Sequence, residues 1–415
     1  MSSAEPAPIS VYKNPELFKF TGYMEGVPEW VDPGDTAEER AERTGWRARG
    51  HELLGLAGSL LPGLGIAAAL AAVGTATADW VGVEVLGFVK SPISPILIAI
   101  AIGLLIRNTL GLPDVYESGL QLCLKRVLRI GVALLGIRLS LGAVGSIGLL
   151  SLPIVVACIA SALLLVSWIN RAMGLPRRLG TLVAVGTAIC GNTAIVATGP
   201  VIGADEDEIS YAVGCITLFG LVALVTYPFL SHALLADPTL AGYFLGTAIH
   251  DTAQVAGAGL LYVQQYGAPE ALDTATVTKL VRNLFMVVVI PMMAVVYHRG
   301  SGEQAGPRPS LKQMVPFFVF GFVAMALLRT LGDASSEPFG GLLSADAWNG
   351  LIESLSKISA WCLTIAMASV GLGTNLQRIR ALGIKPSMVG LAAALIVGVV
   401  SALMIQLMHP WLAAS

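Results

Sequence analysis

The sequence predicts an all-α polytopic membrane protein. Hydrophobic residues make up 55% of its 415 residues, charged residues only 13%, and the mean hydropathy is +0.75. Soluble domains carry roughly 25% charged residues, so this composition excludes an ordinary soluble fold. The net charge is −2, and the Lys and Arg residues are dispersed among loops instead of forming a stripe, which argues against nucleic-acid binding.

Eleven apolar runs are long enough to cross a bilayer, because a hydrocarbon layer of roughly 30 Å needs about 20 helical residues. They cover residues 53–76, 95–112, 120–138, 147–169, 180–203, 209–234, 240–263, 277–298, 313–332, 350–373 and 385–409. The expected fold therefore has about eleven transmembrane helices.

Charged residues sort into alternate loops, as the positive-inside rule requires. The basic loops contain Arg171, Arg177 and Arg178, then Arg299, Arg308 and Lys312, then Arg378, Arg380 and Lys385. The acidic loops contain Asp205, Glu206, Asp207 and Glu208, then Glu270 and Asp273, then Asp333, Glu337 and Asp346. We therefore predict a cytoplasmic N-terminus and a C-terminus on the other side of the membrane.

Residues 1–52 are polar and lead into the first apolar run without the pattern of a signal peptide. They are predicted to be a cytoplasmic tail that contains an amphipathic surface helix, with Asp35 or Thr36 as its N-cap. Neither a disulfide framework nor a metal site is expected, since the cysteines lie in predicted spans without CxxC or Cys/His spacing. These cysteines are Cys123, Cys158, Cys190, Cys215 and Cys362.

Two apolar runs carry similar clusters of small and polar residues, GTAICGNTAIVATGP at 186–200 and GTAIHDTAQVAGAG at 246–259. We call these two clusters the polar knots, without implying a knotted chain. Every backbone polar group in hydrocarbon must be paired, so such knots are tolerated only in tight packing or beside a cavity. Either the small residues let helices approach closely, or the helix breaks and exposes amides that suit an anion. The clustering of an amide, a hydroxyl and a flexible glycine in the first of these segments favours a substrate-binding site. Its candidates in the first knot are Thr187, Cys190, Gly191, Asn192 and Thr193.

His250 and Asp251 lie about ten residues from either end of the seventh run. An ionised side chain there costs roughly 2.5–3.5 kcal/mol, so such residues are usually functional. Gln254 shares their helix face and joins the candidate substrate-binding residues. We expect His250 and Asp251 to take up protons in a coupling step. The alternative is a structural hydrogen-bonded pair.

Further polar residues lie near the ends of other runs. Lys279 and Arg282, at i and i+3 near the outer end of the eighth run, could attract an anion, or could snorkel to the interface. Arg138 and Ser140 end the third run, and Thr374 and Asn375 end the tenth. By the loop charges these two polar ends lie on opposite faces of the membrane, as an inverted repeat requires.

The same loop charges make the fifth and seventh runs point in one direction, so their similar knots are not simple counterparts in an inverted repeat. Either one of the two segments is re-entrant, or small polar residues have converged on one site. We favour convergence.

Several segments follow in order the pattern of a known family. They are PISPILIAIAIGLLIRN, GVALLGIRLSL, GTAICGNTAIVATGPVIGADEDEISYAVGCITLFG, GTAIHDTAQVAGAG, TKLVRNL and ASVGLGTNL. Over approximately residues 90–408 the chain resembles the YeiH-type sulfate exporter family of bacterial inner-membrane proteins. It departs from the family pattern at CGNT, where CGAS is typical, and at Asp251, where Glu is typical.

That family is similar in fold to sodium/proton antiporters and bile-acid symporters. The resemblance implies an extra first helix at 53–90 and two inverted five-helix repeats at 91–235 and 236–410. It also implies a crossed pair of discontinuous helices. These would be the fifth, broken at Gly191 and Asn192, and the tenth, broken near Ser369, Val370 and Gly371.

The resemblance and the polar knots together predict a secondary active transporter, not an enzyme. It would move a small anion, sulfate or a related sulfonate or carboxylate, by alternating access coupled to H⁺ or Na⁺. No cofactor is expected, no Walker motif is present, and the expected partners are the anion, the lipid bilayer and a second copy in a homodimer. Two alternatives are a passive anion channel and an intramembrane enzyme using Cys190 or His250 with Asp251.

Overall fold

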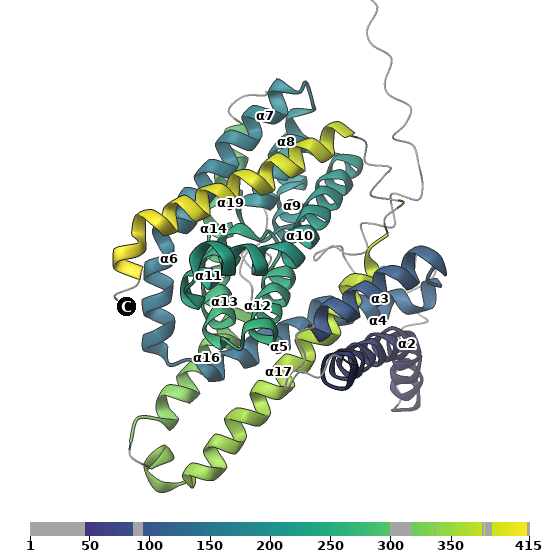
Figure 1. The fold of residues 1–415 in the computed structure, drawn as a ribbon. Coiled ribbons are helices and arrows are strands. Elements are labelled where there is room, and N and C mark those ends of the chain that lie inside the picture. The colour runs from purple at the N-terminus through teal and green to yellow at the C-terminus, as the bar shows by residue number, and fades with distance from the viewer. Residues whose placement is uncertain are drawn as a thin grey trace, which may run out of the picture.

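The computed structural model describes residues 46–85, 94–298, 318–335, 337–375, 377 and 384–412, and these residues form helices without any strand (Figure 1). Most of the predicted tail, including Asp35 and Thr36, lies outside the described residues. The same holds for five of the basic loop residues, Arg299, Arg308, Lys312, Arg378 and Arg380.

The helices follow one another along the chain in this order. The first half contains α2 (Trp46–Asp79), η3 (Trp80–Val85), α3 (Pro95–Thr109), η4 (Asp114–Tyr116), α4 (Glu117–Leu122), η5 (Cys123–Val127), α5 (Leu128–Leu135), η6 (Gly136–Arg138), α6 (Leu141–Ser161), η7 (Ala162–Val166), α7 (Ser167–Ala172), α8 (Arg177–Ala188), α9 (Asn192–Thr198) and η8 (Pro200–Ile202). The second half contains α10 (Glu206–Leu235), α11 (Pro238–Ala248), α12 (Thr252–Tyr266), α13 (Pro269–Leu284), α14 (Met286–His298), α16 (Phe318–Gly332), η9 (Pro338–Gly341), α17 (Ala345–Gly373) and α19 (Ile384–Leu412).

Most of the described part of each predicted apolar run is helical, but the runs differ in length and continuity. Among the described residues, six helical stretches are long and apolar enough to cross a membrane. They are Gly58–Val85, Leu141–Ala172, Asp207–Leu235, Pro269–Tyr297, Ala345–Gly373 and Lys385–Leu412. The chain is therefore a helical multi-pass membrane protein, and the fifth and seventh predicted runs are not among its long helices.

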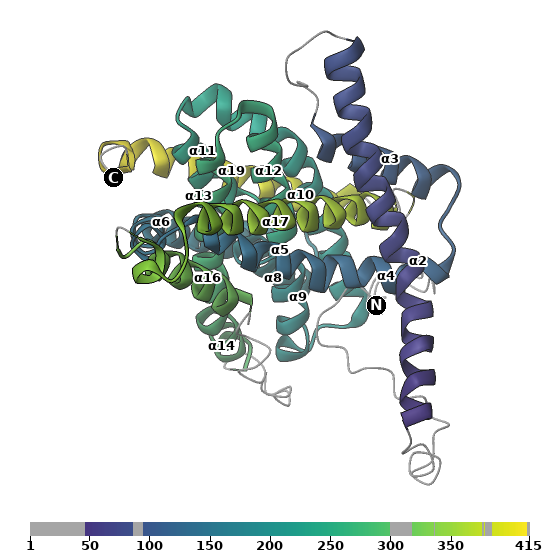
Figure 2. The same cartoon turned by 90° about the horizontal axis from the view of Figure 1, so that it is seen from below.

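The helices gather into two bundles that meet along a limited boundary (Figures 1 and 2). We call α6 to α14 and α19 the hairpin bundle, because it contains the two polar knots, each of which forms the turn of a helical hairpin. We call α2 to α5, η6, α16 and α17 the flanking bundle. Each helix packs mainly within its own bundle, and the boundary is formed chiefly by α12 against α17 and α3, and by α6 against α16.

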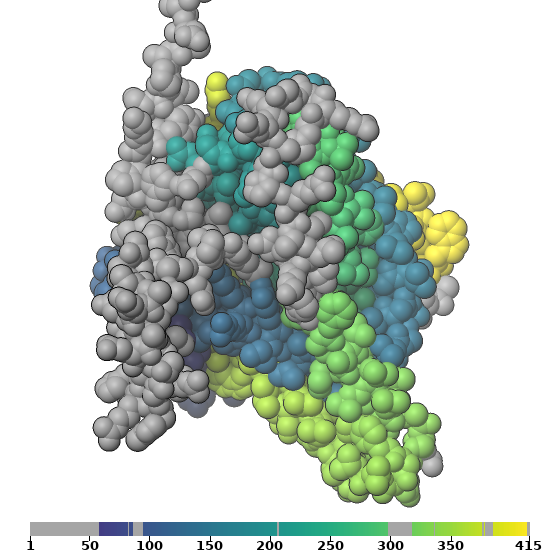
Figure 3. Space-filling model, turned by 180° about the vertical axis from the view of Figure 1, so that it is seen from behind, coloured from purple at the N-terminus to yellow at the C-terminus, as the bar shows by residue number. Residues whose placement is uncertain are grey.

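The flanking bundle extends beyond the hairpin bundle at one end. Figure 3 shows the connection between α16 and α17, in light green, projecting past the neighbouring helices. Within the flanking bundle, α2 and α4 cross where two glycines face each other. A Cβ atom on Gly63 would lie 2.7 Å from the Gly119 Cα and 2.6 Å from the Leu120 backbone nitrogen. This spacing requires glycine, as at close helix crossings in membrane proteins generally.

We predict that Gly63→Val destabilises the protein by about 1–3 kcal/mol, because the new side chain must push α2 away from α4. Gly65→Val is the matched control, since it adds the same side chain to the same helix where no atom lies within 4 Å. Thermal unfolding in detergent checks the prediction. Equal melting temperatures for the two variants would contradict it.

Candidate functional site

The first polar knot is the turn of a helical hairpin. α8 and α9 are separated by a turn at residues 189–191. A Cβ atom on Gly186 would lie 2.7 Å from the Ile195 Cδ1, and one on Gly203 would lie 3.6 Å from the Arg178 Nη2. Because both pairs join residues on opposite sides of the turn, α9 runs back along α8 and the chain returns to the end where α8 began.

The second polar knot separates α11 from α12 at residues 249–251. α11 runs parallel to α13. A Cβ atom on Gly242 would lie 2.6 Å from the Thr274 Cβ, and one on Gly246 would lie 2.7 Å from the Thr278 Cβ, four residues further along both helices. The two helices therefore advance together and in close contact.

α12 runs the other way along α13. A Cβ atom on Gly259 would lie 2.8 Å from the Leu272 Cδ1, near the start of α13. At the far end of α13, the Asn283 Nδ2 donates a hydrogen bond to the Thr252 Oγ1 at 3.1 Å. Since α11 is parallel and α12 antiparallel to the same helix, α11 and α12 form a second hairpin.

The two hairpins enter the bundle from opposite ends. The first begins and ends beside Arg178, which marks what we call the Arg178 end. α10 then crosses the bundle, and near its far terminus the His232 Nδ1 lies 3.0 Å from the Tyr262 hydroxyl of α12. The second hairpin therefore begins and ends at the other end, which carries Asp273 and which we call the Asp273 end.

Both knots are turns of hairpins that fold back on themselves, which agrees with the alternative of a re-entrant segment and extends it to both knots. The favoured convergence on one site stays a prediction. The arrangement also corrects two sequence predictions. The acidic segment 205–208 follows Gly203 and lies at the Arg178 end, not on the opposite face. α17 is continuous through Ser369, Val370 and Gly371, so the discontinuous pair is formed by the fifth and seventh runs, not by the fifth and tenth.

The tips of the hairpins meet. Gly191 has φ 71° and ψ −122°, a conformation that favours glycine, and a Cβ atom there would lie 3.2 Å from the Asp251 Oδ2. Asp251 is the N-cap of α12. Its Oδ1 accepts a hydrogen bond from the Ala253 backbone nitrogen at 2.8 Å, and its own backbone N–H donates to the Gln254 Oε1 at 3.3 Å. The carboxylate thus lies between the two turns.

Lys279 of α13 holds the two tips together. Its Nζ donates hydrogen bonds to the carbonyl oxygens of Ile189 at 2.9 Å, of Ile249 at 3.0 Å and of His250. An ammonium group has three donors, so all of them are used. The carbonyls at the ends of α8 and α11 have no partner within their own helices, and a cation both pairs them and offsets the helix dipole.

Arg282 repeats this arrangement one helical turn later. Its Nε donates to the Ala188 carbonyl at 2.7 Å, its Nη1 to the Thr247 carbonyl at 2.6 Å, and its Nη2 to the Thr187 carbonyl. Lys279 and Arg282 are 1% and 0% exposed. Their predicted place at the outer end of the run was therefore wrong, and neither side chain snorkels.

With each side chain at its ordinary protonation state, the tip junction has a formal charge of +1. Lys279 and Arg282 contribute two buried cations, and Asp251 contributes one carboxylate within electrostatic range of Lys279. The sum is one positive charge, with His250 counted as neutral. Since the cations' hydrogen bonds go to backbone carbonyls, they act on a ligand mainly through their electric field.

Other predicted residues line the same junction. The Asn192 Nδ2 donates to the Thr217 Oγ1 of α10 at 3.3 Å, and the Gln254 Nε2 donates to the Thr217 carbonyl at 3.2 Å. Asn192 and Thr193 are half-buried, as is Asp251. The polar surface of the junction is therefore formed by both hairpins and by α10.

Several tip side chains lack a hydrogen-bond partner within the described part of the chain. Both ring nitrogens of His250, which is 0% exposed, are unpaired, and so are the Thr187 Oγ1 and the Asn283 Oδ1. The Cys190 Sγ lies 3.1 Å from the Met286 Sδ of α14. Buried polar groups without partners mark this junction as unusual.

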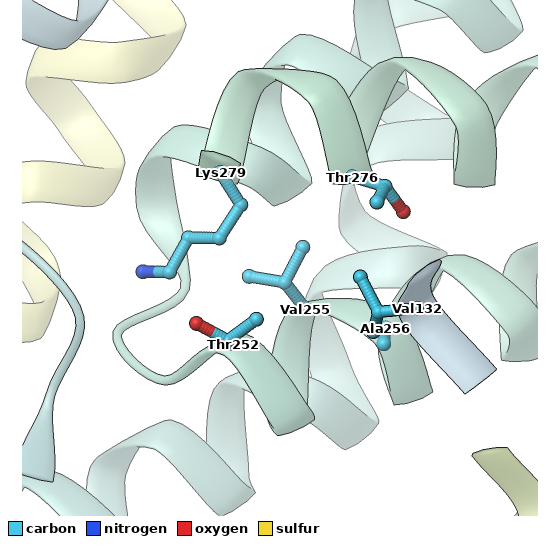
Figure 4. Close-up of a pocket in the computed structure, with 6 residues that line it drawn as sticks. All are labelled: Val132, Thr252, Val255, Ala256, Thr276 and Lys279. Carbon is cyan, nitrogen blue, oxygen red and sulfur yellow. The ribbon is translucent and has the colours of Figure 1, made fainter. Parts of the chain in front are cut away.

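A narrow gap, too small to hold a water molecule, lies beside the junction (Figure 4). α12 and α13 form most of it, with Lys279 and Thr252 pointing toward each other across one side. Val132 closes it from the flanking bundle. The gap therefore lies where the two bundles meet.

The four polar residues at the ends of the third and tenth runs lie away from the tips. Arg138 forms an ion pair with Asp273, and Ser140 caps α6 by accepting from the Ala143 backbone nitrogen. The Thr374 carbonyl accepts from the Asn108 Nδ2 at 3.0 Å, and Asn375 accepts from the Gln377 backbone nitrogen at 2.9 Å. These residues shape helix ends and do not line the junction.

Sequence reasoning missed Thr217 and Thr252, since a single Thr in an apolar helix has no distinguishing pattern. In the described residues, no group of three His, Cys, Asp or Glu side chains is placed to hold a metal ion.

A family model described as conserved hypothetical protein 698 matches residues 62–390. A UPF0324 membrane protein of Agrobacterium fabrum is 34% identical over 343 residues, which cover 82% of this chain and 91% of the relative. Relatives of the same name in Fusobacterium nucleatum and Bordetella pertussis are each 30% identical, over 75% and 80% of this chain and 89% and 90% of their own lengths. The chain belongs to this UPF0324 membrane protein family, which is the YeiH-type family that its sequence motifs indicate.

Proposed function

We propose that this protein is a secondary active transporter that moves a small anion, sulfate or a related sulfonate or carboxylate, across the bacterial inner membrane by alternating access. The N-terminus would lie in the cytoplasm and the C-terminus in the periplasm, as the loop charges predict. A homodimer, and the absence of enzymatic activity, stay predictions.

One observation carries the proposal, the meeting of two oppositely directed hairpin tips at a buried junction with net positive charge. Transporters place substrates near the membrane midplane, where discontinuous helices offer backbone and side-chain polar groups. Here Asn192, Thr193 and Thr252 supply side-chain donors, and Lys279 and Arg282 supply the positive field. A small anion is the ligand that this charge balance favours.

The arrangement of the hairpins also supports alternating access. The segment α8 to α10 is a hairpin followed by a crossing helix, and the segment α11 to α14 repeats this order from the opposite end. We infer an inverted repeat of these two units, in place of a pairing between the fifth and tenth runs. Inversion makes the two faces of a transporter structurally similar, so that each can open in turn.

Asp251 is our candidate for the coupling step. Its carboxylate lies between the tips where an anion would enter the positive field, so an ionised Asp251 and a bound anion would repel each other. Binding of the anion would then favour the protonated carboxyl, and one proton would accompany each anion. His250, with both ring nitrogens unpaired, is the second candidate proton carrier, and Na⁺ is the alternative coupling ion.

We predict that Asn192→Ala raises the KM for the transported anion up to about tenfold, because a lost hydrogen bond to a charged group costs roughly 1.5 kcal/mol. Uptake of radiolabelled sulfate, sulfonates and carboxylates into proteoliposomes provides the measurement. Asn108→Ala is the control, since that amide bonds the Thr374 carbonyl, away from the tips. An unchanged KM in Asn192→Ala would remove this residue from the site.

We predict that anion uptake by the wild-type protein increases when the pH is lowered on the side of the substrate, because protonation of Asp251 removes its repulsion. In Asp251→Asn, exchange of anion across the membrane should continue while the response to an imposed pH gradient disappears. Flux that ignores both pH and Na⁺ gradients in the wild type would instead indicate a passive channel.

We predict that Lys279→Met lowers stability by about 3 kcal/mol or more and abolishes transport, because three buried carbonyls lose their donor. Lys357→Met is the control, since Lys357 is 71% exposed and pairs only with Glu353 of its own helix. Thermal unfolding in detergent would show a large decrease for the first variant alone. Similar melting temperatures for both variants would contradict the role of Lys279 in holding the two hairpin tips together. We call Lys279 and Arg282 together the clamp.

A further inference from the structure

An ion pair and a hydrogen bond join the two bundles at the Asp273 end. The Arg138 Nε of η6, in the flanking bundle, lies 3.1 Å from the Asp273 Oδ1 of α13, in the hairpin bundle. The two side chains are only 21% and 12% exposed. The Ser94 Oγ, at the start of α3, donates to the Gln264 Oε1 near the end of α12 at 2.6 Å. Both contacts therefore cross the boundary between bundles.

The same end of the junction is packed shut. In α12, which leads from the tips to the Asp273 end, every residue from Ala253 to Tyr262 is buried. A Cβ atom on Gly257 would contact the Met367 Sδ of α17, so the bundles touch directly there. Within the described part of the chain, α12 therefore exposes no side chain between the tips and Tyr262.

The tips are more exposed toward the Arg178 end. Asn192 and Thr193 at the start of α9 are half-buried, and so are Val196 and Ala197 one turn further toward that end. Thr217, which faces them from α10, is half-buried as well. These residues of α9 and α10 are therefore less buried than the residues of α12 that lead to the Asp273 end.

We propose that Arg138 and Asp273, supported by Ser94 and Gln264, form a latch that closes the Asp273 end, and that this latch must open before the tips can be reached from that end. The inference rests on the proposed function for its role in transport. The latch itself is a property of the two bundles. A partly buried ion pair suits this role, since it stabilises one arrangement of the bundles without locking it.

The test measures opening directly, in a variant whose native cysteines are replaced and which carries Ala256→Cys as a reporter. Ala256 is 2% exposed and faces Val132 across the bundle boundary (Figure 4), so it becomes reactive only when the bundles separate. We expect Arg138→Gln and Asp273→Asn each to speed labelling by a water-soluble maleimide about three- to tenfold. The exchanged pair, Arg138→Asp with Asp273→Arg, should restore slow labelling.

Glu353→Gln is the control, because Glu353 pairs with Lys357 within α17 and joins no two bundles. It should leave labelling unchanged. Ser94→Ala gives a second, milder opening should a charge variant fail to fold, as judged by its elution and melting temperature. Single variants that label no faster than the parent, or an exchanged pair that labels as fast as they do, would overturn the latch.

Labelling needs no transported substrate, so the result is independent of the proposed function. Faster labelling without any anion flux would support the latch and contradict the transporter. Anion flux without faster labelling would support the transporter and overturn the latch.

Discussion

The arrangement of the hairpin bundle depends on two cations that pair the carbonyl ends of two half-helices. α8 and α11 both stop inside the protein, and each leaves carbonyl groups that no residue of its own helix can pair. Lys279 and Arg282 stand one turn apart on α13, so both reach the same two helix ends. Without them, unpaired carbonyls would face one another in a nonpolar interior, where each costs about 1–3 kcal/mol. The turns, and the polar side chains they carry, exist because this cost is offset.

The same clamp explains how sequence motifs far apart converge. α13 packs against both arms of the second hairpin, and its cations extend to the first hairpin. The close fit needs small residues on α11, since Cβ atoms on Gly242 and Gly246 would collide with α13. The shared GTAI sequence before each turn therefore has a physical reason. It provides a narrow helix end whose carbonyls a neighbouring cation can reach. One such helix, α8, enters from the Arg178 end, and the other, α11, enters from the Asp273 end.

Composition and hydropathy were sufficient to predict a helical membrane protein, and most described residues of the apolar runs are indeed helical. They could not distinguish a helix that crosses from a hairpin that folds back, because both need a similar length of apolar residues. α8 has 12 residues, about 18 Å of helix, which is too short to cross the hydrocarbon layer alone. The turn at Gly191 shows in the sequence only as one Gly among many. Loop charges then misplaced segment 205–208, since each re-entrant turn was counted as a crossing. The sequence shows Lys279 and Arg282 as a pair of cations one turn apart, but the carbonyls that they bind come from residues some 30 to 95 positions away.

All three donors of Lys279 are used by backbone carbonyls, and this has a consequence for selectivity. A site that binds an oxyanion through free Arg and Lys donors selects geometry, because each N–H must meet an oxygen. At this junction the donors of Lys279 are all used, so attraction would come from a diffuse positive field, and shape would be read by neutral groups such as Asn192 and Thr252. Such a site discriminates strongly by charge and only weakly between anions of similar size. The departure from the family pattern at Asn192 and Thr193 therefore falls on the residues that would set the preference among anions. The charged groups of the clamp would set the preference for anions over cations.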